Sequence, residues 1–135
     1  MAETKRTVER PLSPHLGIYR MQITMLMSIM HRITGAALYF GTILLAAWLV
    51  SAAMGERAFA AVNEIFGHPL GKLVLFGYTW AVAHHMLGGM RHLLWDTGRA
   101  MDIRSADVLG WLTILGSLSL TVMLWAVGLS LRGWL

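Results

Sequence analysis

Two otherwise apolar stretches of the sequence contain ionisable side chains that could carry chemistry. The chain has no cysteine, so any metal or cofactor would be bound by His, Met or carboxylate side chains. The first group, in the segment Ser-Ile-Met-His-Arg, comprises Ser28, His31 and Arg32. The second group comprises His84, His85, Gly88, Gly89, Arg91 and His92. Ionisable groups inside a lipid-embedded stretch are costly and usually functional.

The second group has the spacing of a ligand face on a helix. His85, Gly88, Gly89 and His92 share one side of such a helix. Two glycines beside a histidine leave a flat concavity, where a porphyrin could lie with its iron against an imidazole nitrogen. The glycines could instead serve only the close approach of two helices. The adjacent His84, together with two arginines able to meet haem propionates, makes haem binding as well supported as simple helix packing.

Several of these polar residues also have an ordinary structural explanation. Arg32 and Arg91 could extend to the lipid headgroups. His31 could be a neutral histidine that is hydrogen-bonded between two helices. Ser28 could bond back to its own helix, and only its position one turn before Arg32 connects it with that cation.

Membrane-spanning helices are the elements expected to position these residues. Hydrophobic residues make up 56% of the 135-residue chain and charged residues 13%, against about a quarter in soluble domains. Because about 20 apolar residues cross the hydrocarbon core as a helix, the sequence predicts three spans, at about 23–54, 73–95 and 108–130. Short connections predict an all-α, antiparallel up-down bundle over residues 23–135. Residues 1–22 would form an arm on the inner face.

The distribution of basic residues predicts the orientation of the chain. The N-terminal arm and the second connection are rich in them, with Lys5, Arg6, Arg10, Arg20, Arg91, Arg99 and Arg104. The first connection and the C-terminal tail have only Arg57, Lys72 and Arg132. The N-terminus is therefore expected inside, and the net charge of +4 reflects membrane topology rather than a nucleic-acid partner. Glu3 and Glu9 argue against a mitochondrial transit peptide, which favours a bacterial inner (cytoplasmic) membrane.

This orientation brings the two polar groups to similar depth on the inner side of the bilayer. If the first helix begins near Ile23, Arg32 lies about 12–14 Å along it, and His85 lies about 15 Å from the inner end of the second helix. Arg91 and His92 lie closer to the surface. A haem with two histidine ligands is an electron-transfer centre, because no iron position stays open for oxygen. The second ligand could be His31 across the helix pair or a histidine from another subunit. Three helices can enclose little of a haem, which favours the other subunit.

Three segments of the sequence resemble a known family. The segments 28–35 (Ser-Ile-Met-His-Arg-Ile-Thr-Gly) and 85–93 (His-Met-Leu-Gly-Gly-Met-Arg-His-Leu) resemble motifs of the succinate dehydrogenase cytochrome b556 (membrane anchor) subunits, as does segment 10–16 (Arg-Pro-Leu-Ser-Pro-His-Leu). Together with the three predicted spans, the resemblance covers nearly the whole chain. The two membrane motifs are specific in combination.

The resemblance implies a place in respiratory complex II. In that complex a flavoprotein subunit oxidises succinate, an iron–sulfur subunit relays the electrons, and two membrane anchor subunits form the site where ubiquinone is reduced. This chain would take no catalytic part in succinate oxidation. The basic inner arm would dock the iron–sulfur subunit.

The resemblance also implies roles for individual residues. The residue matching His85 is an axial ligand of haem b iron, and the second anchor subunit supplies the other ligand. Ser28 and Arg32 match residues that line the ubiquinone pocket, and His31 matches a residue near the haem propionates. His84 departs from the family pattern by placing a second imidazole beside the ligand. The residues expected to contact the cofactor are His31, Arg32, His85, Arg91 and His92.

Two other functions fit parts of this pattern. A fumarate reductase-type anchor has the same kinds of residues and runs the reaction in the opposite direction. A cofactor-free structural or transport subunit would share the spans but would show no haem absorption.

Overall fold

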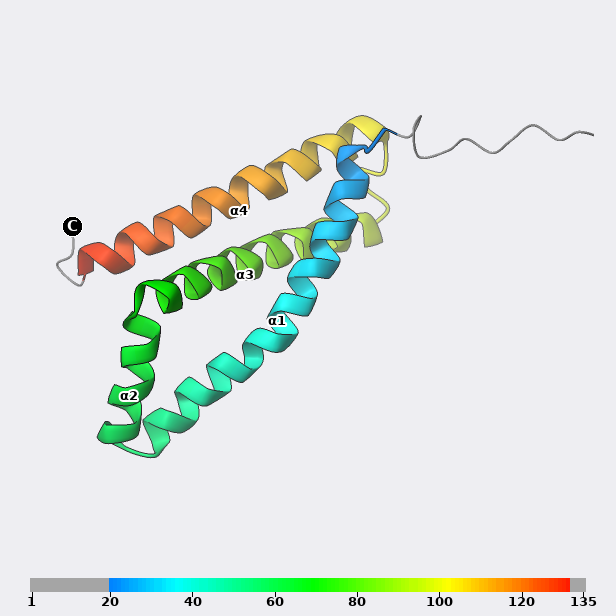
Figure 1. Cartoon of the computed structure of the whole chain (residues 1–135). Coiled ribbons are helices and arrows are strands. Elements are labelled where there is room, and N and C mark those ends of the chain that lie inside the picture. Colours follow the sequence, from blue (N-terminus) through cyan, green and yellow to red (C-terminus); the bar gives the residue numbers. More distant parts are fainter. Residues whose placement is uncertain (1–19, 132–135) are drawn as a thin grey trace, which may run out of the picture.

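The computed structural model describes residues 20–131, in which every regular element is a helix. The helices are α1 (Ile23–Ala53), α2 (Glu56–Gly67), α3 (Pro69–Asp96) and α4 (Ile103–Leu131). Figure 1 shows α3 and α4 side by side, whereas α1 crosses α3 and then diverges from it, with α2 bridging the gap. Most of the predicted N-terminal arm (residues 1–22) lies outside the described residues.

The chain has one helix more than the sequence predicted. The predicted spans 23–54, 73–95 and 108–130 correspond to α1, α3 and α4. The 12-residue α2 lies in the connection between the first two predicted spans, and the predicted count of three helices did not include it. Its charged residues, such as Arg57 and Glu64, lie on one face, and its apolar residues, such as Phe59 and Phe66, lie on the other. A search for about 20 consecutive apolar residues does not detect a helix of this kind.

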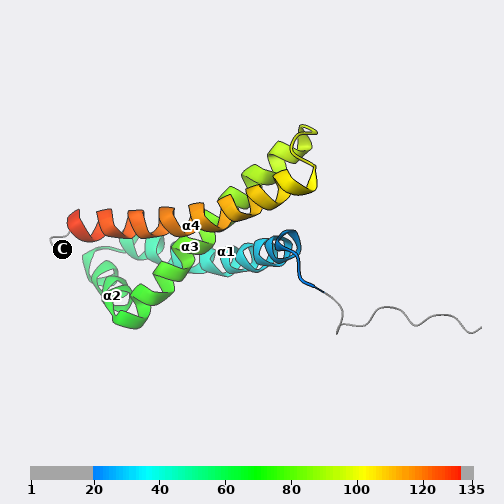
Figure 2. The same cartoon turned by 90° about the horizontal axis from the view of Figure 1, so that it is seen from above.

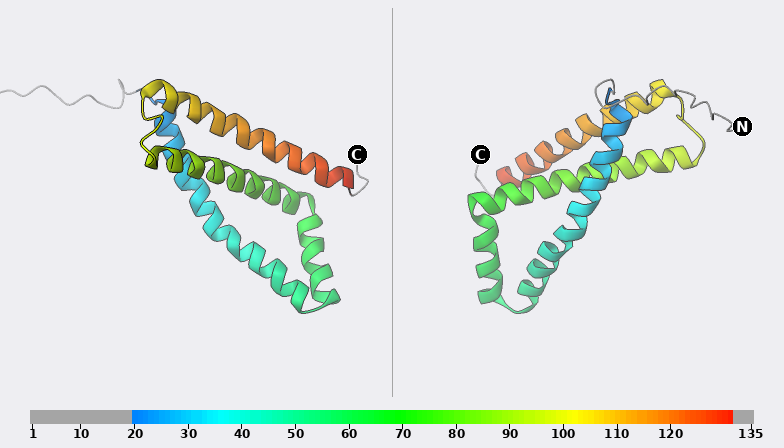
Figure 3. Two further views of the ribbon diagram at one scale, coloured as in Figure 1. Left: turned by 180° about the vertical axis from the view of Figure 1, so that it is seen from behind. Right: turned by 45° about the vertical axis from the view of Figure 1, so that its right-hand side comes forward.

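The ends of the helices alternate between the two ends of the molecule. The start of α1 lies at the same end as the α3–α4 connection, and the end of α4 lies near the α2–α3 junction (Figures 2 and 3). This arrangement brings the segment around His31 on α1 to the segment around His85 on α3. It matches the antiparallel order that the short connections predicted.

Local signals in the sequence explain the sharp turns between the helices. Gly55 follows α1 with a φ of 103°, and Gly98 follows α3 with a φ of 74°, conformations that favour glycine. Asp102 precedes α4, and its carboxylate accepts a hydrogen bond from the Ser105 backbone N–H at 3.0 Å. The hydrogen bonds from the side chain and backbone of Ser105 hold the pKa of this carboxyl below its usual value.

The distribution of buried residues is the reverse of that in a soluble protein. The fully buried apolar side chains among the described residues are only Met27, Ala81 and Ala83. The buried polar side chains are more numerous: Thr34, Ser51, His84, Arg91, Thr113, Ser117 and Thr121. Large apolar side chains point outward along every helix, and a continuous apolar surface of this kind marks contact with lipid or with other membrane helices.

Two of the helices are long and apolar enough to cross a membrane. Both α1 and α4 contain windows with a mean hydropathy of 1.9, and little of either window is buried inside the chain. The 28-residue α3 does not reach the same hydropathy, and its buried residues include His84 and Arg91. The described part of the chain is thus all-α, with two helices that could cross a membrane, and α3 is the least apolar of its three long helices.

Candidate functional site

The crossing of α1 and α3 brings three of the predicted site residues together. The imidazole rings of His31 and His85 are stacked, with centroids 3.9 Å apart and planes 6° from parallel. The ring of His92, two turns further along α3, lies 5.1 Å from that of His31. The structure therefore forms a histidine cluster of His31, His85 and His92 from two helices that are far apart in sequence.

Two glycines make this close crossing possible. A Cβ atom on Gly88 would lie 2.6 Å from the Nδ1 atom of His31, which is closer than real Cβ contacts allow. A Cβ on Gly35 would lie 3.0 Å from the Cε1 atom of His85. Each helix thus presents a glycine where the other presents an imidazole. The neighbouring Gly89 differs, because a Cβ there would meet nothing within 4 Å.

The hydrogen bonds of His85 determine which of its nitrogens is available. Its Nδ1 lies 3.1 Å from the backbone carbonyl oxygen of His31 and 3.3 Å from the hydroxyl of Thr34. The carbonyl can only accept, and the Thr34 hydroxyl donates to the carbonyl oxygen of Met30 at 2.8 Å. Nδ1 therefore carries the hydrogen, and Nε2 keeps its lone pair. Within residues 20–131, Nε2 forms no hydrogen bond.

His84, one residue earlier, faces a different helix. Its side chain is only 2% exposed, and its Nδ1 lies 3.2 Å from the hydroxyl oxygen of Ser117 on α4. The indole of Trp80 covers it at 5.2 Å between ring centroids. His84 therefore connects α3 to α4, whereas His85 faces α1 and the surface beside it.

Ser28 and Arg32 lie on the exposed side of α1, adjoining the face that carries His31. They are one turn apart, as predicted. Neither side chain forms a hydrogen bond or an ion pair with another residue in the part of the chain described. A hydroxyl and a guanidinium are thus free to bind a group from outside the chain.

Arg91 is not part of the histidine cluster. It is 5% exposed and lies against α4 and the start of α1, with its guanidinium 4.9 Å from the ring centre of Trp95. Its Nε and Nη1 atoms are buried and have no hydrogen-bond partner. Six positions separate it from His85, which places the two side chains about 120° apart around α3.

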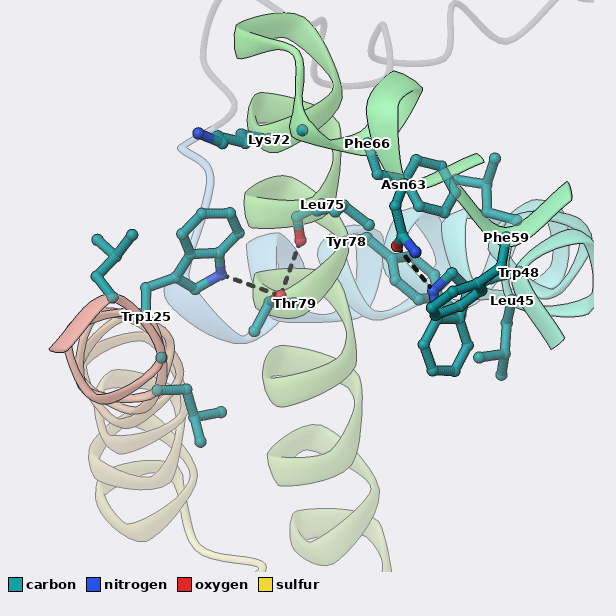
Figure 4. A pocket seen from close by; sticks show the side chains of 15 residues that line it. Leu45, Trp48, Phe59, Asn63, Phe66, Lys72, Leu75, Tyr78, Thr79 and Trp125 are labelled. Carbon is teal, nitrogen blue, oxygen red and sulfur yellow. Dashed lines mark hydrogen bonds between the residues drawn. The ribbon is translucent and has the colours of Figure 1, made fainter. Parts of the chain in front are cut away.

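One cavity lies away from every predicted site residue. It has a volume of about 690 Å³ and lies between the diverging end of α1, α2, the start of α3 and the end of α4. Figure 4 shows aromatic side chains around it. Two indoles are fixed by hydrogen bonds, Trp48 to Asn63 at 3.3 Å and Trp125 to Thr79 at 3.2 Å.

Sequence reasoning gave Thr34 and Gly35 no role of their own, and it gave Ser117 on α4 only a close-packing role. Thr34 contacts the Nδ1 of His85, Gly35 faces its ring, and Ser117 bonds to His84. The spacing of Thr34, three residues after His31, is a signal that would have placed it on the same face. No spacing could have paired Ser117 with His84, because that contact depends on how α4 is rotated against α3.

The residues at the crossing fit the role of a haem ligand. A ligating histidine usually donates its other ring N–H to a carbonyl or carboxylate, which fixes the tautomer, and His85 does so. The open space beside Gly89 adjoins the same side of α3. The three rings of the histidine cluster are stacked or tilted against one another, and no group of three His, Asp or Glu side chains in residues 20–131 is arranged to hold a metal ion. A metal bound by His85 would therefore take its other ligands from outside the described residues. The four nitrogens of a porphyrin are ligands of this kind.

Comparison with known proteins gives a consistent result. The model of the succinate dehydrogenase/fumarate reductase transmembrane subunit family matches residues 6–124. The succinate dehydrogenase cytochrome b556 subunit of Paracoccus denitrificans is 42% identical over 123 residues, covering 91% of this chain and 94% of the relative. The Rickettsia felis subunit of the same name is 36% identical over 127 residues, covering 93% and 99%. The mitochondrial cytochrome b560 subunit of Sus scrofa is 38% identical over 120 residues, covering 84% and 71%. The chain belongs to the family of succinate dehydrogenase/fumarate reductase transmembrane subunits.

Proposed function

We propose that this chain is a haem-binding, quinone-facing membrane anchor subunit of a succinate dehydrogenase, working within respiratory complex II. The observation that carries the proposal is the state of His85, whose Nδ1–H is donated to the His31 carbonyl while Nε2 stays without a partner. The names of the relatives, cytochrome b subunits of succinate dehydrogenase, support the same assignment.

The proposal includes three membrane spans, α1, α3 and α4, with the N-terminus inside. The polar residues that lower the hydropathy of α3 support rather than oppose a span, because His84 and Arg91 are buried against other helices. The side chains that α3 exposes, such as Met86, Met90 and Leu93, are apolar. The amphipathic α2 would lie at the outer surface, and the membrane would be the bacterial inner membrane.

His85 would be one axial ligand of haem b, which when bound supplies one-electron transfer. The other ligand would come from a second anchor subunit. His31 is poorly suited to that role, because its ring is stacked on His85 and its Nδ1 points at Gly88. Three side chains could bind the haem propionates: the guanidinium of Arg32 and the imidazoles of His31 and His92. Arg91 stays a prediction for the cofactor, and its burial against α4 gives that prediction no support.

Ser28 and Arg32 would bind ubiquinone. Reduction of the quinone takes two electrons and two protons and develops negative charge on its carbonyl oxygens. The Ser28 hydroxyl can donate a hydrogen bond to one such oxygen, and the fixed charge of Arg32 stabilises it. Arg32 cannot be the acid, because a guanidinium keeps its proton at any relevant pH. The proton donor would belong to a partner subunit or be a water molecule.

The remaining subunits would carry the succinate chemistry. A flavoprotein subunit would oxidise succinate and an iron–sulfur subunit would pass electrons to the quinone site. A fumarate reductase-type anchor belongs to the same family, and the names of the relatives favour the succinate dehydrogenase direction. The alternative is a cofactor-free subunit, and the absence of haem absorption in the purified complex would identify it.

The ligand assignment is tested by paired variants of adjacent residues in the assembled complex. We expect His85→Ala to abolish or severely alter the low-spin b-type spectrum, because it removes the free imidazole nitrogen. We expect His84→Ala to keep the spectrum, since His84 bonds to Ser117 on the other side of α3. Loss of the spectrum in His84→Ala, with retention in His85→Ala, would reverse the assignment.

A further inference from the structure

The groove between α3 and α4 contains a charged group that lies apart from the histidine cluster. A cavity of about 370 Å³ lies there, lined by Leu87, Met90, Arg91, Leu94, Leu109, Leu112 and Thr113. Arg91 provides its only charged side chain. That side chain is only 5% exposed, and two of its three guanidinium nitrogens, Nε and Nη1, are buried without a hydrogen-bond partner.

An unpaired guanidinium in this position is costly. Burying a charge without a counter-charge is strongly unfavourable, and the cost is larger inside a membrane. The indole of Trp95 offsets part of it through a cation–π contact at 4.9 Å. No carboxylate in residues 20–131 reaches the guanidinium, so an anion from outside the chain would complete the site.

The position of the groove favours a lipid as the source of that anion. Leu87, Met90 and Leu94 lie on the side of α3 opposite His85, so a haem bound to His85 lies on the other side of the helix. Arg91 is five residues before the end of α3, about 7–8 Å along the helix. A phosphate at headgroup level is therefore within reach of its side chain, and the leucines and Met90 give an apolar path below it.

We propose that Arg91 binds the phosphate of an inner-leaflet phospholipid, with one acyl chain lying in the groove between α3 and α4. The chemistry recognised is a phosphate diester attached to a hydrocarbon chain. The guanidinium donates to the phosphate oxygens with the geometry that suits arginine, and Leu112 and Met90 pack against the chain. The bound lipid would then form part of the contact between α3 and α4.

The test measures phospholipid retained by the intact complex after washing with phosphate-free dodecyl maltoside. Bound phosphorus is determined per complex, and delipidated complex is then supplied with phosphatidylglycerol or with inorganic phosphate. We expect Arg91→Gln to lose a tightly held phospholipid that the wild type keeps, and Arg91→Lys to lose it only in part. Arg99→Gln, in the exposed connection after α3, is the matched control and should retain it.

A second variant keeps the cation and closes the groove. Leu112→Trp should also lose the tightly held lipid, and only phosphatidylglycerol, not inorganic phosphate, should raise the thermal midpoint of delipidated wild type. Haem absorption should be retained in Arg99→Gln and Leu112→Trp, neither of which is assigned to the cofactor, so loss of the lipid from Leu112→Trp with haem retained separates this inference from the proposed function. Equal bound phosphorus in all variants would overturn it, as would stabilisation by inorganic phosphate alone or loss of haem in Arg91→Gln with unchanged lipid.

Discussion

At the scale of single residues, Ser28 and Arg32 are exposed polar groups one turn apart on a helix that otherwise exposes apolar side chains. Neither has an intramolecular partner within the described range, so their solvation must come from a bound group, from lipid headgroups or from a partner subunit. A quinone carbonyl is the group whose reduction would use both of them, a hydrogen-bond donor and a fixed positive charge. Ordinary snorkelling would use only the arginine.

Ser28→Ala and Arg32→Leu should slow succinate-to-quinone electron transfer and spare succinate oxidation by an artificial acceptor that takes electrons upstream. Losing a hydrogen bond to a reacting oxygen typically costs about 2.7–4 kcal/mol, or roughly a hundred- to a thousandfold in rate. Ser28→Ala should cost less, because water can fill the vacated space, and Arg32→Leu more. The measurement is the ratio of the two activities in complex shown to be intact. An unchanged ratio in both variants would leave these residues with packing and headgroup roles only.

The histidine pair shows what the sequence could and could not predict at this scale. The motif around His85 and its glycines predicted a ligand face, and the resemblance selected His85 over His84. The physical reason for that choice came only with the structure, where His84 bonds to Ser117 and His85 donates to the carbonyl of His31. Such contacts depend on how each helix is rotated against its neighbours, which local spacing does not specify.

At the scale of helices, the crossing of α1 and α3 depends on small residues facing rings. The backbone of α3 approaches α1 closely at Gly88, where any side chain would overlap the ring of His31. Gly41 on α1 has the same relation to the ring of Tyr78. These contacts fix where the two helices meet and therefore where His85 is presented.

Gly88→Val should disrupt the crossing, whereas Gly77→Val on the same helix should be tolerated. A Cβ on Gly88 would lie 2.6 Å from His31 Nδ1, while one on Gly77 would meet nothing within 4 Å. Overpacking of this kind typically costs about 1–3 kcal/mol. We expect a lower thermal midpoint and weaker haem retention for Gly88→Val, both measured on the purified complex. Equal behaviour of the two valine variants would mean that the crossing is not a tight contact in the assembled protein.

The helices themselves were largely predictable, with one exception. Runs of apolar residues predicted helices at 23–54, 73–95 and 108–130, and the structure has Ile23–Ala53, Pro69–Asp96 and Ile103–Leu131. Such runs are long enough to detect because a helix that crosses the hydrocarbon needs about 20 apolar residues. The short α2 was not predicted, since its stability comes from contacts such as Trp48 with Phe59 and Asn63 rather than from a long apolar run. Its position, bridging α1 and α3, also could not be read from the sequence (Figure 3).

At the scale of the whole molecule, the chain has a polar interior and an apolar exterior. The buried side chains include His84, Arg91 and Ser117, while Tyr39 is 73% exposed and Ile43 is 65% exposed. Such a chain needs lipid and partner helices to cover it. Among its described basic residues, Arg20, Arg99 and Arg104 lie at the end that holds the start of α1 and the α3–α4 connection, which would be the inner end by the positive-inside rule.

Reporter fusions test this orientation. A reporter fused after Leu135 should read as outside, and one inserted near Ala100 should read as inside, because the single proposed span α4 separates the two positions. Protease accessibility of the same fusions provides an independent measurement. The reverse result at both positions would invert the orientation and remove the basis for placing Ser28 and His85 on the inner side.

The most direct test of the central claim is the optical spectrum of the purified complex that contains this chain. Succinate added to the oxidised complex should produce the absorption of a reduced, low-spin b-type haem, because electrons from succinate would reach a haem held by His85 and a histidine of the partner subunit. The same complex with His85→Ala should lack that absorption. An intact, succinate-oxidising complex without haem absorption would contradict the claim that this chain is a haem-binding anchor.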